Sequence, residues 1–383
     1  MKIFIKIIIF LCITSVLNIQ KISAEEKIKI GLLVPLTGQN SEMGKSIIKS
    51  VRLAINKIDN SPIEIFPKDT ASNPEITLRS AKKLYEDGIK IIIGPVFNKN
   101  LIYLDELEDV TFLSLTNKII NNPKNIISAG INADSQLKTI IKFQKLNKIK
   151  KTIFLIPKKN YKEEIEKAIK QSKIKTKEVF YYDSDPTKLT NQIEKITKYY
   201  QRKQNLEDEI KRLENSDEIN KEKKIKALEK LDTLGKVDFD SIIISDFDES
   251  LKSITTSLLY TDVSPKKIYF IALNQWFDES LLKEKNLQPI YFPSINKNNY
   301  DEFIKTYFET FNEYPNQLSF LSYDLIGLVY YLIIQNDFIV DQKMFVKKNK
   351  FKGKIGIFEI KDKKINHILN FYKAEENDFK KIF

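Results

Sequence analysis

Cysteine and histidine are nearly absent from this chain of 383 residues, and their scarcity removes several kinds of chemistry. Cys12 and His367 are the only residues of their types. A Ser-His-Asp triad would have to use His367, which has no obvious nucleophilic serine near it and which we expect at the surface. No spacing of His and Cys is typical of a zinc or iron site. The sequence therefore predicts no catalytic residue, no metal and no cofactor. The alternative is an enzyme that uses a pair of carboxylates, as a glycosidase does, because such a site needs neither histidine nor cysteine.

Arginine is also scarce in a chain that is otherwise basic. Lys and Arg together number 63 against 51 acidic residues, a net charge of +12, yet arginine stands only at positions 52, 79, 202 and 212. Nucleic-acid-binding proteins typically use clusters of arginine for phosphate and base contacts. We therefore expect no nucleic-acid partner, and only a weak general attraction for anionic surfaces.

Residues 1–24 have the composition of a cleavable signal peptide. Lys2 and Lys6 supply the positive start, residues 7–16 the apolar run, and Ala24 a small residue at the cleavage position. An apolar run of about ten residues is too short to span a bilayer, although an uncleaved anchor remains the alternative. Cleavage would remove Cys12, which we do not expect to carry a lipid, and would leave no disulfide. No later segment approaches the ~18 apolar residues of a membrane helix.

Strand and helix signals alternate along the rest of the chain. The near-continuous apolar run 28–34 predicts a strand buried on both faces, and residues 43–58 have apolar side chains at helical spacing. Further strands are predicted at 63–66, 89–93, 110–115 and 126–129, and, after a restart, at 152–156, 178–181, 241–245 and 268–273. This alternation indicates an α/β protein with two lobes in tandem, each built on a parallel sheet.

The length suits two lobes joined by hinge strands, since a chain of this size exceeds one ordinary core. We expect the N-terminal lobe to contain residues 25–130 and 293–338. The C-terminal lobe would then contain residues 131–292 and 339–383.

Residues 188–236 break the alternation, because they are charged and helical throughout. Apolar residues step by three and four on either side of Asn215-Ser216-Asp217. This pattern predicts an antiparallel helical hairpin inserted in the C-terminal lobe. Two arrangements stay open: the hairpin packs on its own lobe, or it projects as an arm that binds a protein partner.

The loop from Gly38 to Gly44-Lys45-Ser46 is close to a phosphate-binding loop but does not match it. Five residues separate Gly38 from Gly44, where the nucleotide-binding motif has four. We therefore expect only a helix start whose free amides face a cleft.

Several short motifs, in this order, resemble the type I periplasmic binding proteins, the leucine/isoleucine/valine-binding kind. They are residues 30–38, Asp69 with Pro74, residues 91–95, Tyr323-Asp324, and residues 351–356. The resemblance implies a non-catalytic periplasmic protein with a two-lobed, Rossmann-like type I periplasmic binding fold, a hinge and a ligand cleft.

The second lobe resembles more narrowly the alphaproteobacterial penicillin-binding protein activators. The matching segments are residues 201–203, 231–235, 238–240 and 263–267, with Trp276. This resemblance implies a regulator of peptidoglycan synthesis that contacts a peptidoglycan synthase. The alternative is the solute-binding protein of an ABC importer for amino acids or small amides, with an ABC permease as its partner.

The resemblance also assigns the positions of the ligand cleft. They are Thr37, Gly38, Asn98, Thr116, Asn117, Tyr161, Asp246, Asn274 and Trp276. Asn98 stands where a serine is usual, and Asp246 is an acidic partner for a ligand ammonium by position only. A buried ammonium without a carboxylate is costly, so we expect a free amino acid to be a poor ligand.

Overall fold

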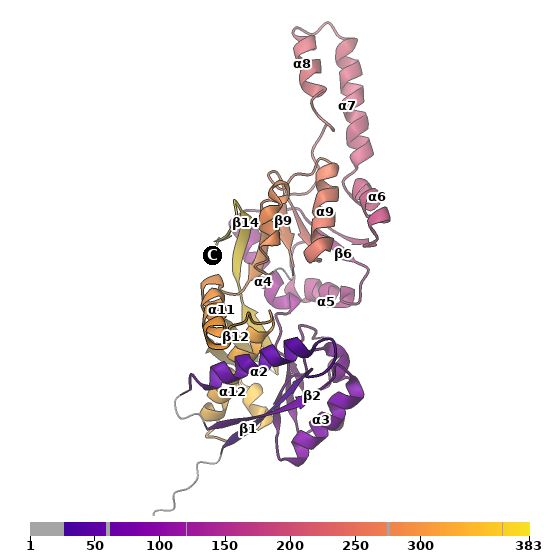
Figure 1. The fold of residues 1–383 in the computed structure, drawn as a ribbon. Helices are drawn as coiled ribbons and strands as arrows, with labels where there is room; N and C mark the ends of the chain where they lie inside the picture. The colour runs from indigo at the N-terminus through magenta and orange to yellow at the C-terminus, as the bar shows by residue number, and fades with distance from the viewer. Residues whose placement is uncertain (1–26, 59–61, 120, 274–275, 362) are drawn as a thin grey trace, which may run out of the picture.

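The computed structural model describes residues 27–58, 62–119, 121–273, 276–361 and 363–383. The predicted signal peptide, Cys12 and Asn274 lie outside these residues. The described chain forms two α/β lobes stacked along one axis, with a helical arm at the end remote from the first lobe (Figure 1). Within the described ranges, no helix combines the length and the apolar character needed to cross a membrane.

The first lobe is a five-stranded parallel sheet in the order β2-β1-β3-β4-β5. Ile30, Leu32 and Val34 of β1 face α2 and α12, whereas Leu33 faces α3, so both faces of the sheet are buried. The elements are β1 (Ile28–Val34), α2 (Ser41–Ile55), β2 (Ile63–Asp69), α3 (Pro74–Glu86), β3 (Ile91–Ile93), η1 (Asn98–Leu101), η2 (Leu104–Glu106), β4 (Thr111–Ser114) and β5 (Ile126–Ser128). From the far end of the chain, α11 (Lys297–Phe311) and α12 (Ser319–Gln335) complete this core.

The second lobe is a seven-stranded sheet in the order β15-β14-β10-β9-β8-β6-β7. Its five strands from β10 to β7 are parallel, and β14 and β15 add an antiparallel edge. The strands are β6 (Thr152–Pro157), β7 (Glu178–Tyr182), β8 (Ser241–Ile244), β9 (Tyr269–Ala272), β10 (Ile290–Ser294), β14 (Asn370–Glu375) and β15 (Asp378–Lys381). The helices are α4 (Ala133–Leu146), α5 (Lys162–Ser172), α6 (Pro186–Ile196), α9 (Asp248–Tyr260) and α10 (Ser280–Lys283), with the short η3 (Lys285–Leu287).

The C-terminal segment is divided between the lobes, which corrects the expectation that residues 339–383 lie wholly in the second. With η4 (Gln342–Phe345), the strands β11 (Asn349–Lys352), β12 (Ile357–Lys361) and β13 (Lys364–Ile368) form an antiparallel sheet. Phe345, Phe358 and Ile360 are buried in the core of the first lobe, beside α12. The alternation of apolar residues predicts a hairpin but does not reveal which of two cores buries it.

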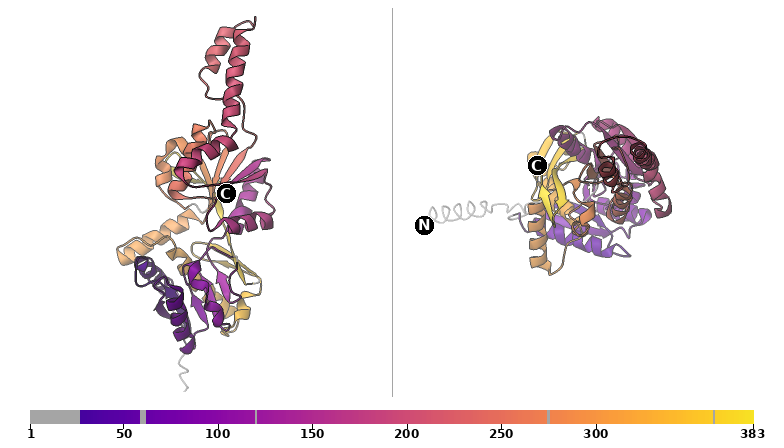
Figure 2. Two further views of the ribbon diagram at one scale, coloured as in Figure 1. Left: turned by 90° about the vertical axis from the view of Figure 1, so that its right-hand side faces the viewer. Right: turned by 90° about the horizontal axis from the view of Figure 1, so that it is seen from above.

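The helical insertion is shorter than the predicted 188–236. Its first part lies in α6, where Leu189 and Ile193 are buried in the core of the second lobe. Only α7 (Tyr199–Glu214) and α8 (Lys221–Leu228) form the antiparallel hairpin. This α7–α8 arm projects away from both lobes (Figures 1 and 2), so the hairpin does not pack on its own lobe.

Asp324 of α12 fastens the turn between β11 and β12 to the first lobe. Its buried carboxylate accepts the backbone N–H groups of Lys354 at 2.8 Å, Ile355 at 3.1 Å and Gly356 at 2.7 Å. Burial raises the pKa of Asp324 to about 7, against the three backbone hydrogen bonds, which lower it. The contact is so close that a Cβ atom at Gly353 would lie 2.5 Å from the carboxylate.

Replacing Gly353 by alanine therefore tests this anchor. We expect Gly353→Ala to lower the free energy of unfolding by about 1–3 kcal/mol, because the new methyl group collides with a buried carboxylate. Gly356→Ala is the matched control, since its Cβ atom would lie 3.6 Å from Asp324, an ordinary contact distance. Urea unfolding of both variants measures the difference, and equal losses would contradict the assignment.

Candidate functional site

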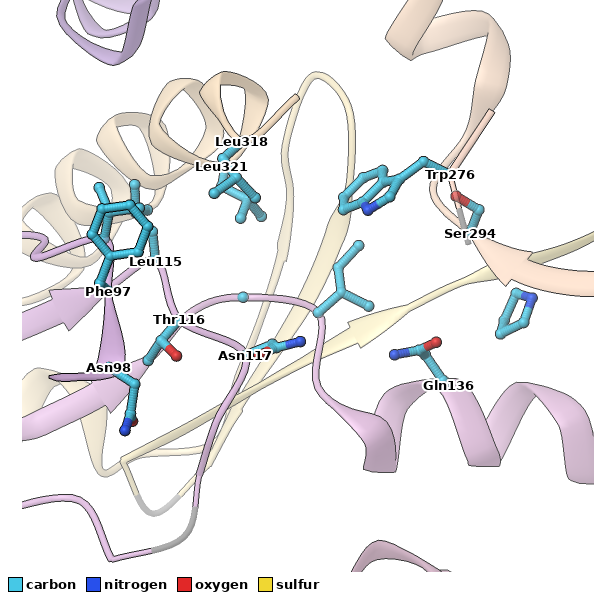
Figure 3. A pocket seen from close by; sticks show the side chains of 14 residues that line it. Phe97, Asn98, Leu115, Thr116, Asn117, Gln136, Trp276, Ser294, Leu318 and Leu321 are labelled. Atoms are coloured by element: carbon cyan, nitrogen blue, oxygen red, sulfur yellow. The ribbon is translucent and has the colours of Figure 1, made fainter. Parts of the chain in front are cut away.

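A pocket with a volume of about 300 Å³ lies between the lobes, where loops follow the carboxyl ends of the strands. Figure 3 shows Trp276 on one side of it, with Phe97, Leu318 and Leu321 on the other. Its lining consists of Val96, Phe97, Asn98, Leu115, Thr116, Asn117, Gly130, Ile131, Gln136, Trp276, Pro293, Ser294, Leu318 and Leu321. The structure thus brings together four of the residues expected at the cleft, Asn98, Thr116, Asn117 and Trp276.

Among the described residues, none that lines this pocket has a charged side chain. Its walls are mainly apolar, and its polar groups are amides and hydroxyls. A charged ligand group would lose its hydration here without gaining a counter-ion, which is costly. The pocket therefore suits a small uncharged molecule better than a zwitterion. In the described part of the chain, no group of three or more His, Cys, Asp or Glu residues is placed to hold a metal ion.

Sequence reasoning missed several lining residues, of which Gln136 is the clearest. Gln136 lies in α4, directly after the chain crosses from the first lobe, and is almost fully buried. Its place just beyond β5 was the only signal that could have identified it. Thr37 and Gly38, in contrast, do not line the pocket. The Thr37 hydroxyl donates to Asp69 at 2.6 Å, so this loop is tied to its own lobe instead.

An adjoining pocket of about 340 Å³ shares Asn117 and Trp276 with the first and extends it toward α5 and α9. Tyr161 lines this part, as expected for a cleft residue, together with the acidic Glu164 and Asp248. Glu164 also connects the lobes, because its carboxylate accepts the backbone N–H of Ile119 at 2.7 Å.

Asp246, the expected acidic cleft residue, lines neither pocket. Its carboxylate is buried and accepts hydrogen bonds from Lys159 Nζ at 3.0 and 3.1 Å, Tyr161 at 3.2 Å and Tyr182 at 2.9 Å. Burial, together with the negative charge of Asp246, raises the pKa of both tyrosines, which keeps them protonated as donors. The carboxylate is thus already supplied with partners from its own lobe.

The chain crosses between the lobes at residues 129–132, 295–296 and 369, and His367 lies beside the third crossing. The expectation of an exposed histidine is wrong, because His367 is buried. Its Nε2–H donates to the carbonyl of Ala129 at 2.8 Å, and its backbone N–H donates to Ser135 Oγ at 2.9 Å. The histidine therefore joins the third crossing to the first.

The base of the α7–α8 arm is closed by a buried arginine. Arg202 donates to the carbonyl of Thr197 at 3.0 Å, to the hydroxyl of Thr233 at 2.9 Å and to the carbonyl of Thr261. Leu234 N–H in turn donates to the carbonyl of Arg202 at 2.9 Å. Both ends of the arm are thus fixed to each other and to the end of α9.

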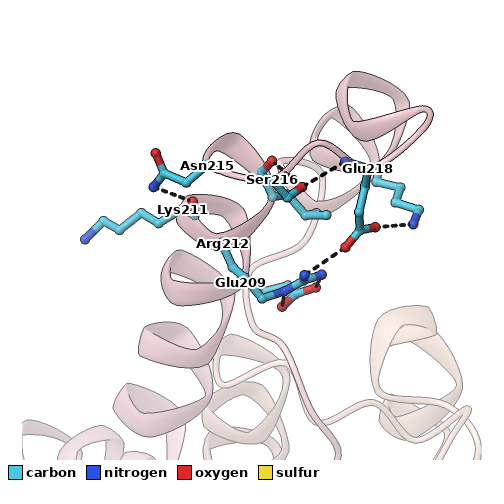
Figure 4. A network of polar contacts seen from close by, with 8 residues as sticks. Glu209, Lys211, Arg212, Asn215, Ser216 and Glu218 are labelled. Atoms are coloured by element: carbon cyan, nitrogen blue, oxygen red, sulfur yellow. Dashed lines mark hydrogen bonds and ion pairs between the residues drawn. The ribbon is translucent and has the colours of Figure 1, made fainter.

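The tip of the arm is ordered by an ionic network (Figure 4). Arg212 contacts Glu209 at 2.8 Å and Glu218 at 2.8 Å, and Lys224 contacts Glu218 at 2.6 Å. One exposed ion pair contributes little to stability, but a bidentate arginine in a network specifies a geometry. Beyond this network, Ile219 exposes 87% of its surface at the arm tip.

Comparison with known proteins identifies the fold. Residues 27–198 match the model of the family described as periplasmic binding protein. No curated protein sequence matches the chain. The C-domain of LpoA (YraM) from Haemophilus influenzae, described as a regulator of PBP1A, is similar at 16% identity with a TM-score of 0.61, over 93% of this chain and 100% of that chain.

Two solute-binding proteins are similar to a comparable extent. They are the leucine-binding protein LivK of Thermotoga maritima (14% identity, TM-score 0.57, 93% of this chain and 98% of that chain) and the solute-binding protein of an ABC transporter from Rhodopseudomonas palustris BisB5 in complex with 3,4-dihydroxybenzoic acid (17% identity, TM-score 0.55, 91% and 92%). The expected two-lobed type I periplasmic binding fold is therefore confirmed. At these identities the likeness extends to the fold and not to the ligand.

The buried histidine predicts a pH dependence of stability. Burial lowers the pKa of His367 to about 4, from an ordinary value near 6.5, and among the described residues its Nδ1 atom has no hydrogen-bond partner. The unfolded chain therefore binds a proton more readily, and stability is lost as the pH falls from 6.5 to 4, by about 3 kcal/mol from this group.

The variant His367→Gln isolates this contribution, because glutamine can keep the donor toward Ala129 without titrating. Urea unfolding from pH 4 to 7 should show a steeper acid loss in the unchanged protein than in the variant. Carboxylates that titrate in the same range, such as Asp324, contribute equally to the pH dependence of both proteins, so their effect cancels in the comparison. Parallel curves for the two proteins would contradict the buried neutral histidine.

Proposed function

We propose that this protein is a non-catalytic periplasmic regulator of peptidoglycan synthesis that acts by contacting a peptidoglycan synthase through its α7–α8 arm. The observation that carries the proposal is the arm itself, which is built as a separate element and projects from the second lobe (Figure 2). Two likenesses support it: the motifs of the second lobe resemble penicillin-binding protein activators, and LpoA, whose C-domain has this fold, is described as a regulator of PBP1A.

The construction of the arm favours a role in binding. A flexible extension would lose conformational entropy when it bound a partner, whereas a pre-ordered one loses less. Arg202 orders the base and the Arg212 network orders the tip, so the geometry exists before any partner arrives. Ile219 at the tip and Tyr200 at the base expose apolar surface that contributes little to folding. Exposed aromatic and apolar groups on a rigid support are typical anchors of protein interfaces.

Removing the arm while keeping its base tests this function. Residues 205–231 would be replaced by a short Gly-Ser linker, which retains Arg202 and Thr233 and needs to bridge only a short gap. We expect thermal unfolding to stay cooperative and near the original temperature, since the arm adds little to either core. We also expect the immobilised variant to retain no penicillin-binding protein from a detergent extract of cell envelopes, measured with a fluorescent penicillin.

A point variant serves as the finer test with a matched control. Ile219→Asp places a charge at the arm tip, and Ile102→Asp does the same at an exposed position of the first lobe, 61% accessible. Retention should fall at least about tenfold for the first and stay unchanged for the second, as expected when one anchor of an interface is lost. If both variants, or the arm-less protein, still retain the same synthase, the arm is not its binding site.

The pocket favours a second candidate function, that of a solute-binding protein for an ABC importer. Its apolar walls and amide groups fit a small uncharged aromatic or amide better than an amino acid. Under this function, benzamide should raise the melting temperature by several degrees by mass action, while L-leucine should not. Trp276→Ala should abolish that shift, because it removes one wall. No shift with benzamide and related neutral amides would count against this function.

A further inference from the structure

Asp246 is a buried charge whose one counter-ion among its hydrogen-bond partners is a lysine of the same lobe. Its side chain is 1% exposed, whereas that of Lys159 is 35% exposed, and the salt bridge between them measures 3.0 Å. The remaining partners are the hydroxyls of Tyr161 and Tyr182 and the backbone N–H of Phe247 at 3.2 Å, all of which are neutral. The positive charge that pairs with Asp246 therefore belongs to Lys159, whose side chain extends from the solvent-exposed surface to the buried carboxylate.

These groups gather at the edge of the second sheet that faces the first lobe. Lys159 follows β6, Tyr182 ends β7, and Asp246 follows β8. These three parallel strands are neighbours in the sheet, so the three residues lie close together at their carboxyl ends. Tyr161 forms the link to the cleft, because its ring lines the adjoining pocket while its hydroxyl donates to Asp246. The Lys159 ammonium, which has three N–H donors, contacts both Asp246 oxygens and Ser250 Oγ at 3.4 Å, while the two tyrosines hold the carboxylate in place.

The energetics indicate what happens when the lysine is absent. A buried carboxylate that loses its counter-ion is strongly destabilised, because neutral hydroxyls do not replace the lost charge. The position of the Lys159 ammonium would then be open to water and small solutes, since its stem already reaches the surface. A small cation with N–H donors would be drawn to the vacated position.

We propose that Asp246 and Ser250 form a binding site for a primary ammonium group, with Tyr161 and Tyr182 as positioning residues on Asp246, and that Lys159 occupies this site from within the chain. Lys159 is thus a specificity-determining residue, which prevents amino acids and other primary amines from binding at this edge of the cleft. The inference does not rest on the proposed function, since it concerns only the ligands that the cleft rejects.

The test is chemical rescue of Lys159→Ala, with methylammonium chloride as the probe. We expect the variant to melt several degrees below the unchanged protein and to recover a few degrees in millimolar methylammonium, by mass action. Tetramethylammonium chloride at the same concentration has no N–H donor and should give no recovery. The unchanged protein, whose site is filled, should respond to neither salt.

A second variant keeps the test informative. Lys159→Ala combined with Asp246→Asn removes the buried charge as well, so it should show no selective response to methylammonium. If Lys159→Ala does not fold unaided, its refolding yield in the two salts replaces the melting temperature as the readout. The proposal is overturned if Lys159→Ala is as stable as the unchanged protein, if both salts act equally, or if the unchanged protein gains as much as the variant.

Discussion

Burial of parallel strands on both faces is the constraint on which the rest of this structure depends. In β1, Ile30 and Leu32 pack toward α2 and α12 while Leu33 packs toward α3, and β6 and β8 are enclosed in the same way in the second lobe. With both faces covered by helices, the strand ends and the insertions are the places where a site can be built beside the sheet. The pocket and the Asp246 cluster lie at the strand ends, and the arm is an insertion.

Three buried ionisable side chains fix the local arrangement of the chain at three places in this fold. Asp324, Asp246 and Arg202 are each almost fully buried, and each is saturated by groups distant in sequence. A buried charge is costly unless its partners are in position, so each of these residues favours one local arrangement. Asp324 holds the third sheet on the first lobe, Asp246 fills the edge of the cleft, and Arg202 closes the base of the arm.

Contacts across the cleft and between the chain crossings relate the two lobes. Trp276, which follows β9 of the second lobe, packs edge-on against Phe320 of α12 with ring centroids 5.5 Å apart. Glu164 accepts a hydrogen bond from Ile119 across the cleft, and His367 connects two of the chain crossings. Continuous crossings of this kind between two lobes are the construction expected of a hinge. The cleft and the arm lie at opposite ends of the second lobe, so a partner bound at the arm need not obstruct the pocket.

The α/β class, the two lobes, the buried strand at 28–34 and the presence of a helical insertion were all predictable from the amino-acid sequence. These features follow from the periodicity of neighbouring residues, which local sequence encodes directly. The family resemblance predicted Asn98, Thr116, Asn117 and Trp276 as cleft residues, and these four line the pocket between the lobes.

Three features became apparent only in the folded chain: which core buries the strands 349–368, that α6 belongs to the lobe and not to the arm, and that His367 is internal. The folded chain also places Gln136 in the pocket. It pairs Lys159 with Asp246, although these two residues are 87 positions apart in the sequence. The physical reason is that burial of one face and the pairing of one charge depend on which distant segments meet in space. Periodicity shows that a side chain needs a partner, and only the folded chain supplies that partner.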